Sequence, residues 1–411
     1  MGNRVVVTGL GCTSPLGNDV PTSWEACING KSGIDRITNF DPDLYRCQIA
    51  GEIKNFELPD IIPTKEVKKM DLFIQYSIAA TQEALNDARL VITEDIEEDV
   101  GVSMGVGIGG LGCIEKYSKI LIDNGPKRVS PFFIPMTLSN LAPGYISLLF
   151  RAKNYTACSV SACTSSNHAI GTAARTIERG DAKVVIAGGA ESSVTPLGIA
   201  GFASMNALST RNDDPQFASR PFDKDRDGFV MGEGSGILIL EDAEFAKARG
   251  ARIYCEITGY GFSSDAFHVT SPSAEGPARA MEMTLKDSGL AAQDIDYINA
   301  HGTSTPVGDL NELKAIKMAL GEKAAQQLSI SSTKSMTGHL LGAAAAIEAI
   351  FSIKALHHNF IPPTINIDNM DAECDLDVTP NTGKSKELSV AMSNAFGFGG
   401  TNASIMFQKM N

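Results

Sequence analysis

The feature that most constrains this fold is the alternation of short apolar runs with segments of helical periodicity. The runs have the length and composition of buried strands. They cover residues 4–8, 100–106, 155–161, 184–187, 236–240, 254–258, 296–299, 327–330, 388–392 and 403–407. Between them, apolar residues repeat at helical spacing from Met70 to Leu85, and Pro277 and Gly289 are placed to begin and end another helix. The alternation predicts an α/β fold in which helices cover layered sheets.

Two stretches of the chain resemble each other. Residues 7–14 are Val-Thr-Gly-Leu-Gly-Cys-Thr-Ser, and residues 257–264 are Ile-Thr-Gly-Tyr-Gly-Phe-Ser-Ser. A match this short can arise by chance, but as a true repeat it indicates two duplicated halves, residues 1–250 and 251–411. No low-complexity linker separates them, so we expect the halves to pack as one body.

Composition excludes several functional classes. The 411 residues carry a net charge of −13, which argues against a general nucleic-acid-binding surface. Hydrophobic residues make up 43%, but no apolar stretch has the length of a membrane-spanning helix. The eight cysteines are scattered without C-x-x-C spacing, which favours free thiols over disulfides or a zinc site. Because no signal-peptide pattern opens the chain, we expect a cytoplasmic protein.

Two motifs imitate cofactor sites. Residues 105–110 fit G-x-G-x-x-G, but no acidic residue ends a second strand at the required distance, so close backbone packing explains these glycines better. Residues 223–228 resemble a calcium loop, but Glu233 stands one place too early to be its bidentate ligand. Neither motif predicts a bound metal or cofactor.

Cys163 is the candidate nucleophile. It follows the strand-like run 155–161 and precedes a helix that begins near Ser165. Free backbone N–H groups and the helix dipole stabilise a thiolate at such a junction, so we expect a thiol pKa below the usual value of about 8.5. The alternative is a buried, inert cysteine, which is the commoner situation for cysteines in general.

Two histidines and a lysine accompany this cysteine. His301 ends the strand-like run 296–299, and Thr303 and Thr305 alternate after it, so their hydroxyls can share one face. His339 is predicted to begin an alanine-rich helix, whose N-terminus biases it toward the neutral form. Lys334 can pair with Glu348 only through tertiary folding.

A glycine-rich segment, residues 394–402, contains Phe398 and Gly399. The N–H of Phe398 can complete an oxyanion hole with that of Cys163, although a glycine-rich turn without chemistry is the simpler interpretation. A cysteine hydrolase needs one histidine with Asn or Asp, whereas two histidines and a lysine better suit an acyl-thioester enzyme that stabilises an enolate.

Together these motifs resemble those of the β-ketoacyl-[acyl-carrier-protein] synthases, condensing enzymes of the thiolase-fold superfamily, and most of all the elongating synthase II type. The resemblance extends over essentially the whole chain. It is carried by residues 5–17, 161–170, 219–234, 299–309, 332–342 and 393–402. It implies a thiolase-like layered αβαβα fold, with the cysteine in the first half and both histidines in the second.

The resemblance also implies roles for single residues. Cys163 takes the acyl chain as a thioester, while His301 and His339 bind the malonyl thioester and stabilise its enolate. Lys334 supports the site with Glu348. The remaining implied positions are a gate at Phe398, a decarboxylation aid at Phe229, pantetheine contacts at Thr303 and Thr305, a further substrate contact at Gly399, and an acyl pocket lined by Ile108, Phe133 and Phe202.

The implied reaction is decarboxylative condensation, which lengthens an acyl chain by two carbons and needs no metal or organic cofactor. The implied partners are an acidic acyl carrier protein and a second copy of the chain, bound through a sheet edge. The carrier's docking patch corresponds to Lys65, Lys68, Lys69, Lys127 and Arg128, which would otherwise be read as solvated helix faces.

Two positions depart from the family pattern. Ser166 stands where elongating synthases commonly have glycine, and Asn206 stands where a basic residue is common. These departures leave the acyl-chain preference and the strength of carrier docking open. They also leave a role in a specialised polyketide or polyene pathway open. Two further alternatives are a non-catalytic partner subunit, against which the presence of Cys163 argues, and a cysteine hydrolase that acts on thioesters.

Overall fold

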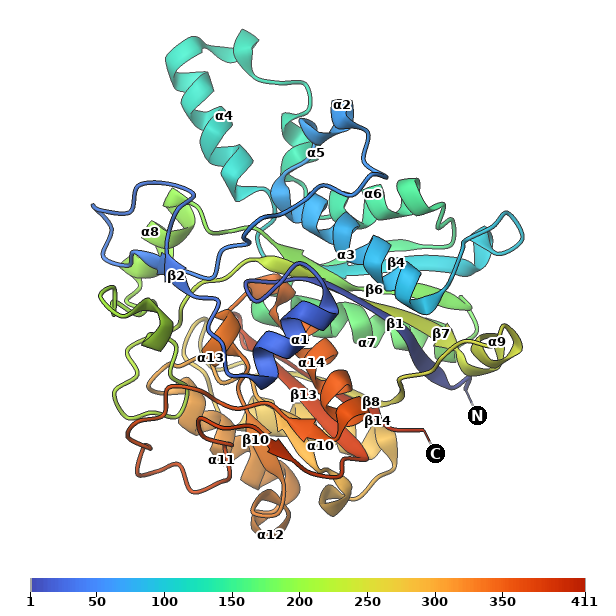
Figure 1. The fold of residues 1–411 in the computed structure, drawn as a ribbon, viewed down its shortest axis with the longest axis vertical. Helices are drawn as coiled ribbons and strands as arrows, with labels where there is room; N and C mark the ends of the chain where they lie inside the picture. The colour runs from blue at the N-terminus through green and yellow to red at the C-terminus, as the bar shows by residue number, and fades with distance from the viewer. Residues whose placement is uncertain (1, 411) are drawn as a thin grey trace.

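The computed structural model describes residues 2–410, and its centre is one ten-stranded sheet (Figure 1). Each of the ten predicted runs overlaps one of its strands. The strands are β1 (Val5–Thr13), β4 (Val100–Gly105), β5 (Thr156–Ser159), β6 (Val184–Glu191), β7 (Gly234–Asp242), β8 (Cys255–Ser264), β9 (Tyr297–Asn299), β10 (Ser329–Ser331), β13 (Val390–Gly397) and β14 (Thr401–Gln408). Two short pairs, β2 (Asp35–Arg36) with β3 (Ile49–Ala50) and β11 (Phe360–Ile361) with β12 (Lys384–Ser385), stand apart.

Fourteen α-helices are assigned in the described part of the chain. They are α1 (Val20–Ile28), α2 (Thr64–Val67), α3 (Leu72–Ala88), α4 (Leu111–Asn124), α5 (Phe133–Thr137), α6 (Leu141–Phe150), α7 (Ser165–Glu178), α8 (Pro196–Ser204), α9 (Ala243–Ala248), α10 (Glu275–Ser288), α11 (Gly308–Leu320), α12 (Glu322–Ala325), α13 (Lys334–Thr337) and α14 (Ala344–His358). Within residues 2–410, none of them has both the length and the apolar character needed to cross a membrane.

The strand order repeats one topology twice. The first five strands in chain order are arranged β5-β4-β6-β7-β1, and the next five are arranged β10-β9-β13-β14-β8. In both sets the order by position in the chain is third, second, fourth, fifth, first. The sets meet where β1 pairs antiparallel with β8, from Val5 opposite Ile257 to Val7 opposite Cys255. The fold is therefore the predicted layered α/β type, with two halves of the same topology.

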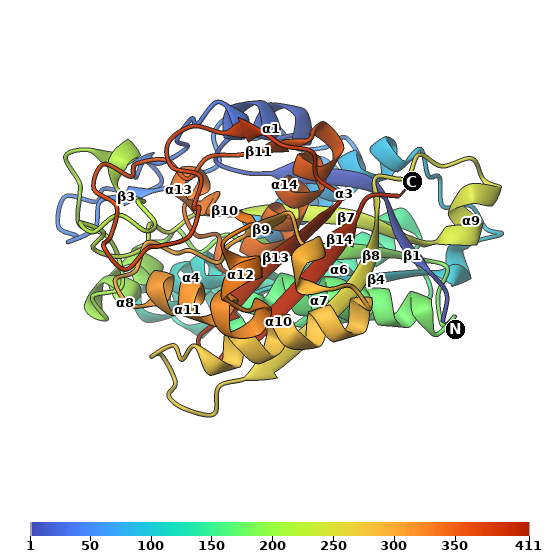
Figure 2. The ribbon, with the colours of Figure 1, turned by 90° about the horizontal axis from the view of Figure 1, so that it is seen from below.

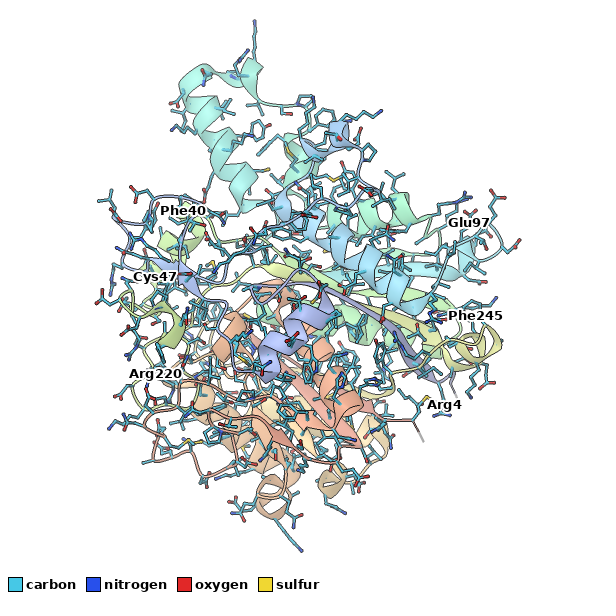
Figure 3. All side chains as sticks on the ribbon, in the orientation of Figure 1. Arg4, Phe40, Cys47, Glu97, Arg220 and Phe245 are labelled. Atoms are coloured by element: carbon cyan, nitrogen blue, oxygen red, sulfur yellow. The ribbon has the colours of Figure 1, made fainter. Side chains whose placement is uncertain are left out.

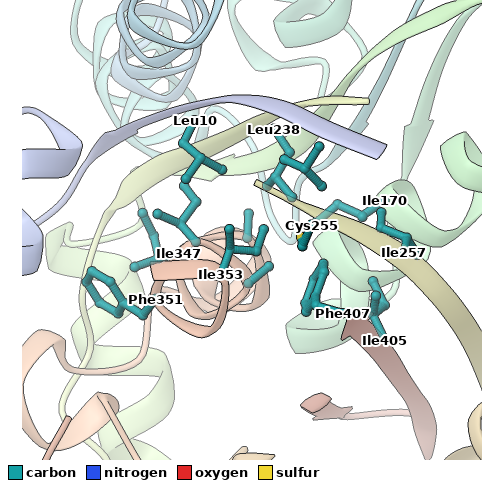
Figure 4. Packing of buried hydrophobic residues seen from close by; sticks show 14 of the residues in the cluster. Leu10, Ile170, Leu238, Cys255, Ile257, Ile347, Phe351, Ile353, Ile405 and Phe407 are labelled. Atoms are coloured by element: carbon teal, nitrogen blue, oxygen red, sulfur yellow. The ribbon is translucent and has the colours of Figure 1, made fainter. Parts of the chain in front are cut away.

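Helices form three layers around the two sets of strands. In the middle, α7 and α14 pack against each other and against strands of both halves. On the outer faces, α3 packs on β1 and β7, while α10 packs on β8 and β14 (Figures 1 and 2). Apolar residues from both halves, among them Leu10, Leu238, Ile347 and Phe407, form one buried cluster around the middle layer (Figure 4). The result is the predicted αβαβα arrangement.

The repeated Thr-Gly-x-Gly sequence has a packing function. It lies in β1 and β8, the first strands of the two halves. A Cβ atom added at Gly11 would lie 2.0 Å from the carbonyl oxygen of Ala80 in α3, and one added at Gly261 would lie 2.2 Å from that of Ala280 in α10. Both halves thus need glycine where the outer helix contacts the backbone of its first strand.

Two predicted helix starts differ from the structure. The helix predicted from Pro277 begins two residues earlier, at Glu275, and ends as predicted at Gly289, whose φ is 69°. The helix predicted to begin at His339 begins instead at Ala344. Gly338, with φ of 70°, breaks the chain before His339, and a short 3₁₀ turn over Leu341–Ala343 precedes α14.

Candidate active site

A cavity of about 440 Å³ opens between the two halves. Its lining includes Cys163 from the first half and His301 and His339 from the second. The nitrogen and sulfur atoms that these three side chains offer all lie within 4.8 Å of one another. The structure therefore brings the predicted nucleophile and both predicted histidines to one point.

Cys163 lies on the turn between β5 and α7, as predicted. Ala162 has a φ of 52°, in the left-handed region that side chains rarely adopt, and a 3₁₀ turn over Ala162–Thr164 leads into the helix. The Ser165 side chain accepts a hydrogen bond from the Ser161 N–H, at 2.9 Å, and donates one to the Ala162 carbonyl, at 2.6 Å. The small residues around Cys163 thus hold a sharp turn that presents its sulfur to the cavity.

The prediction of a lowered thiol pKa is wrong. Burial raises the pKa of Cys163 to about 12, although the Lys334 charge and the backbone N–H groups of Phe398 and Cys163 act in the opposite direction. Removal from water thus outweighs the helix terminus. At neutral pH the group is a thiol, and the Nε2 atom of His339, 2.9 Å from the sulfur, is placed to accept its proton.

Both histidines are held in the neutral form. Burial and the nearby charge of Lys334 keep the pKa of His301 and of His339 well below the usual range. The predicted helix terminus is not the cause, because His339 precedes α14 by five residues. The two rings meet edge to face, with centroids 5.3 Å apart. Two neutral imidazoles therefore lie side by side in the wall of the same cavity.

Lys334 and Glu348 form the expected ion pair through tertiary folding. Their side chains are only 1% and 3% exposed. Burial raises the pKa of the Glu348 carboxyl to about 7, while Lys334 opposes the shift. Lys334 acts on the site through its charge, because it does not line the cavity.

Phe398 lies on the turn that joins β13 to β14. Its backbone N–H and that of Cys163 both lower the pKa of the Cys163 thiol, against the larger effect of burial, so both groups lie on the side of the sulfur where an oxyanion hole is expected. Its ring, 37% exposed, lies 6.4 Å from that of Phe202. Phe202 in turn contacts Phe229, and Phe229 contacts His339, with centroid separations of 5.5 and 5.4 Å. A row of aromatic rings therefore runs from Phe398 to His339.

Two predicted positions do not line the cavity. Gly399 is absent from the cavity lining, and its N–H is already donated to the carbonyl of Val269, at 2.7 Å. Phe133 is carried by α5 and packs on Tyr117 of α4, at 5.3 Å between centroids, outside the cavity of its own chain.

The other predicted cavity residues are in place. Thr303 and Thr305 line the wall, with their hydroxyl oxygens 3.1 Å apart, so they share one face as expected. Ile108 and Phe202 form part of the apolar lining.

The five predicted docking residues lie outside the cavity, on the α2 region and on the segment after α4. Lys65, Lys68, Lys127 and Arg128 are exposed. Lys69 is partly buried, pairs with Glu66 at 2.8 Å, and lies 4.8 Å from the centre of the Phe132 ring. This contact joins the α2 region to the segment that holds the other two cations, but none of the five lines the cavity.

Several site residues were missed by the sequence analysis. Glu312 of α11 accepts the N–H groups of His301 and Gly302, at 2.9 and 2.8 Å, and Phe396 lies 5.6 Å from the His301 ring. The segment 265–273 forms much of the cavity mouth. Nothing in the local sequence marks these residues, because Glu312 is a single glutamate on a helix and residues 265–273 form a polar loop.

The calcium-like loop has a structural role. Its Asp223 carboxylate accepts hydrogen bonds from the Arg220 side chain, at 3.0 Å, and from the N–H groups of Asp368 and Asn369, at 2.9 and 2.7 Å. Figure 3 labels Arg220 at the left of the molecule. Arg226 of the same loop binds the carbonyls of Thr305 and Pro306, and so supports the threonine wall of the cavity.

Comparison with known families and proteins agrees with this geometry. Residues 2–246 match the N-terminal domain of beta-ketoacyl synthase, and residues 254–368 match its C-terminal domain. The chain is 50% identical over 409 residues to the 3-oxoacyl-[acyl-carrier-protein] synthase 2 of Vibrio harveyi, with 99% of each chain covered. It is 51% identical to the Synechocystis protein of the same name, covering 99% of this chain and 98% of the relative.

Solved structures show the same fold. The ishigamide ketosynthase/chain length factor superposes with a TM-score of 0.93 at 35% identity, with full coverage of both chains. The type II polyketide ketosynthase AntDE, solved in complex with the acyl-carrier protein AntF, gives a TM-score of 0.91 at 33% identity, again with full coverage. With its two matched domains and with a cysteine and two histidines converging from the two halves, this chain belongs to the β-ketoacyl synthase family.

Proposed function

We propose that this chain elongates fatty acids by decarboxylative Claisen condensation. An acyl group on Cys163 combines with malonyl-[acyl-carrier protein] to give CO₂ and a β-ketoacyl-[acyl-carrier protein] two carbons longer. The observation that carries the proposal is the convergence of a thiol and two neutral imidazoles within 4.8 Å. A hydrolase would need only one of these histidines.

The first half-reaction loads the enzyme. The Cys163 sulfur transfers its proton to His339 Nε2, 2.9 Å away, and attacks the thioester carbonyl of the acyl carrier. The N–H groups of Cys163 and Phe398 hydrogen-bond to the oxyanion that forms. The carrier's sulfur then leaves, takes the proton back from His339, and departs as a thiol.

The second half-reaction builds the carbon–carbon bond. Neutral His301, and His339 once solvent exchange has moved its ring proton from Nδ1 to Nε2, donate hydrogen bonds to the malonyl thioester oxygen. These bonds stabilise the enolate left when the carboxylate departs as CO₂. The enolate carbon attacks the acyl carbon on Cys163, and the cysteine sulfur leaves as a thiolate, which takes up one proton from solvent to restore the thiol. Because loss of CO₂ supplies the electron pair, no strong base is required.

The remaining site residues have supporting roles in this proposal. Thr303 and Thr305 hydrogen-bond the amides of the carrier's pantetheine, and Phe398 gates the mouth of the cavity. Phe229 packs beside the malonyl group, and Ile108 and Phe202 contact the acyl chain. Lys334, paired with Glu348, adds to the effect of burial, which keeps both histidines neutral.

The proposed partners are an acidic acyl carrier protein and a second copy of the chain. The carrier docks on Lys65, Lys68, Lys69, Lys127 and Arg128. Strand β5 ends the sheet with one edge unpaired in the described residues, and Val160 beside it is 62% exposed, so the second copy binds there. The eight free cysteines suit a reducing cytoplasm.

A second candidate is the same chemistry in a specialised polyketide or polyene pathway. Ser166 motivates it, because this residue stands where elongating synthases commonly have glycine and its side chain donates to the Gly342 carbonyl beside the acyl wall. The superposition on polyketide ketosynthases is compatible with both pathways.

The test is intact-mass analysis of the purified chain after incubation with acyl carriers of graded length. We expect one acyl adduct on Cys163, and a β-ketoacyl product once malonyl carrier is added. Cys163→Ala should give neither. Release of free acid would support a hydrolase, and absence of any adduct would favour a non-catalytic subunit. The chain lengths that load would separate the two pathways.

A further inference from the structure

Glu191, at the end of β6, is a buried carboxylate that the mechanism does not use. Its side chain is fully inaccessible to solvent. It accepts backbone N–H groups from Gly107 at 2.9 Å, from Ile108 and Gly109 at 3.2 Å each, and from Gly342 at 3.2 Å. The hydroxyl of Ser193 donates a further hydrogen bond at 3.1 Å.

These hydrogen bonds join two segments that form different parts of the cavity. Residues 107–109 contain Ile108, part of the proposed acyl wall. Gly342 follows His339 and Leu341, which also line the cavity. The Glu191 carboxylate therefore holds residues 107–109, which carry the apolar wall, in a fixed position relative to the segment that contains His339.

The two segments lie so close together that no side chain fits between them at Gly107 or Gly342. A Cβ atom added at Gly342 would lie 2.1 Å from the nitrogen of Gly107, and one added at Gly107 would lie 2.5 Å from Glu191 Oε2. The backbones meet directly, and only the carboxylate lies between their N–H groups.

Glu191 does not touch the cavity, so it is not a catalytic group. Burial raises the pKa of its carboxyl to about 7, and the N–H groups around it oppose that shift. A buried carboxylate is costly unless its oxygens are hydrogen-bonded, and here every hydrogen bond comes from the two wall segments and Ser193.

We propose that Glu191 is a positioning residue that sets the acyl-chain selectivity of the enzyme by fixing the Ile108 wall against the His339 segment. The inference rests on the proposed loading of Cys163. It predicts that loosening Glu191 changes which chain lengths load, and that this change exceeds any general loss of activity.

The experiment compares Glu191→Gln with the wild type. The amide group cannot accept the N–H bonds that one carboxylate oxygen accepts, so the wall segments lose part of their shared anchor. We expect the ratio of kcat/KM for loading between the best and the worst acyl carrier to fall by about tenfold, with the change mainly in KM. Intact mass of the Cys163 adduct measures each rate.

Glu83→Gln is the matched control. Glu83 is a carboxyl whose pKa burial likewise raises to about 7, and it accepts the N–H groups of Cys12 and Val20 at 2.8 Å each. It does not line the cavity. We expect this variant to keep the wild-type chain-length profile, whatever stability it loses.

Further outcomes decide the proposal. A folded Glu191→Gln with the wild-type profile would show that the residue is merely structural. If that variant fails to fold, Ser193→Ala removes one hydrogen bond to the same carboxylate and should shift the profile in the same direction; an unchanged profile there overturns the proposal. Absence of loading by the wild type would instead refute the proposed function.

Discussion

At the scale of single residues, the site depends on the opposing effects of burial and local charge. Cys163 lies at the start of α7, a place that favours a thiolate, yet burial dominates and raises its pKa to about 12. The same burial keeps His301 and His339 neutral, which is the form the proposed enolate step needs. A site that excludes water thus obtains its neutral donors together with a thiol that must give up its proton to react.

Alkylation of Cys163 tests this balance. Below the pKa of a thiol, its thiolate fraction rises tenfold per pH unit, so with a pKa of about 12 the rate with iodoacetamide should rise about tenfold per unit from pH 7 to pH 9. Intact-mass kinetics measure the rate, and Cys163→Ala corrects for the other cysteines. A plateau below pH 8.5 would show that the helix terminus outweighs burial.

The sequence predicts some site residues better than others. Cys163 and His301 follow strand-like runs, and His339 precedes an alanine-rich segment, so the neighbours of all three reveal them. Glu191 gives no such signal, because its partners Gly107 and Gly342 lie 84 and 151 residues away. The thiol pKa could not be predicted either, since burial at a site depends on all the elements that enclose it.

At the scale of secondary-structure elements, glycine decides how closely helices approach strands. The sequence predicts the ten strands but places the ends of β1, β6, β8 and β13 too early. These strands continue through glycine and small polar residues, which apolar periodicity does not detect. Their extension follows from the neighbouring strands and from helices packed on the strand backbone.

Gly11→Ala should therefore destabilise the fold. The new Cβ would lie 2.0 Å from the Ala80 carbonyl oxygen, so α3 must move away from β1. We expect a loss of about 1–3 kcal/mol or more in the free energy of unfolding, measured by denaturant titration. Gly144→Ala is the control, because its Cβ would meet only Leu141 at 3.9 Å. Equal stability of the two variants would contradict the packing argument.

At the scale of the whole molecule, the unpaired edge of β5 is the place where we propose that a second copy binds. Exposed apolar residues lie on and beside two of the helices that follow α4, and one of these helices, α6, packs on β5. Leu148 is 72% exposed, Ile134 57% and Leu138 45%. Such a surface around a sheet edge is unfavourable in water unless a partner covers it.

Val160→Asp should convert the proposed dimer to a monomer. We expect light scattering to give twice the chain mass of 43.6 kDa for the wild type and a single chain mass for the variant. Since Val160 is 62% exposed in one chain, the substitution should barely change the stability of the monomer. Leu44→Asp, at a residue 98% exposed, is the control and should remain dimeric. A monomeric wild type would refute the β5 interface.

The middle layer makes the two halves mutually dependent. Because α7 belongs to the first half and α14 to the second, each half alone would expose the inner face of its strands and one side of its helix. A molecule nicked between α9 and β8 would be a two-fragment system, in which neither fragment contains both the thiol and the imidazoles. Reassociation of the fragments and recovery of the active site would then be one and the same event.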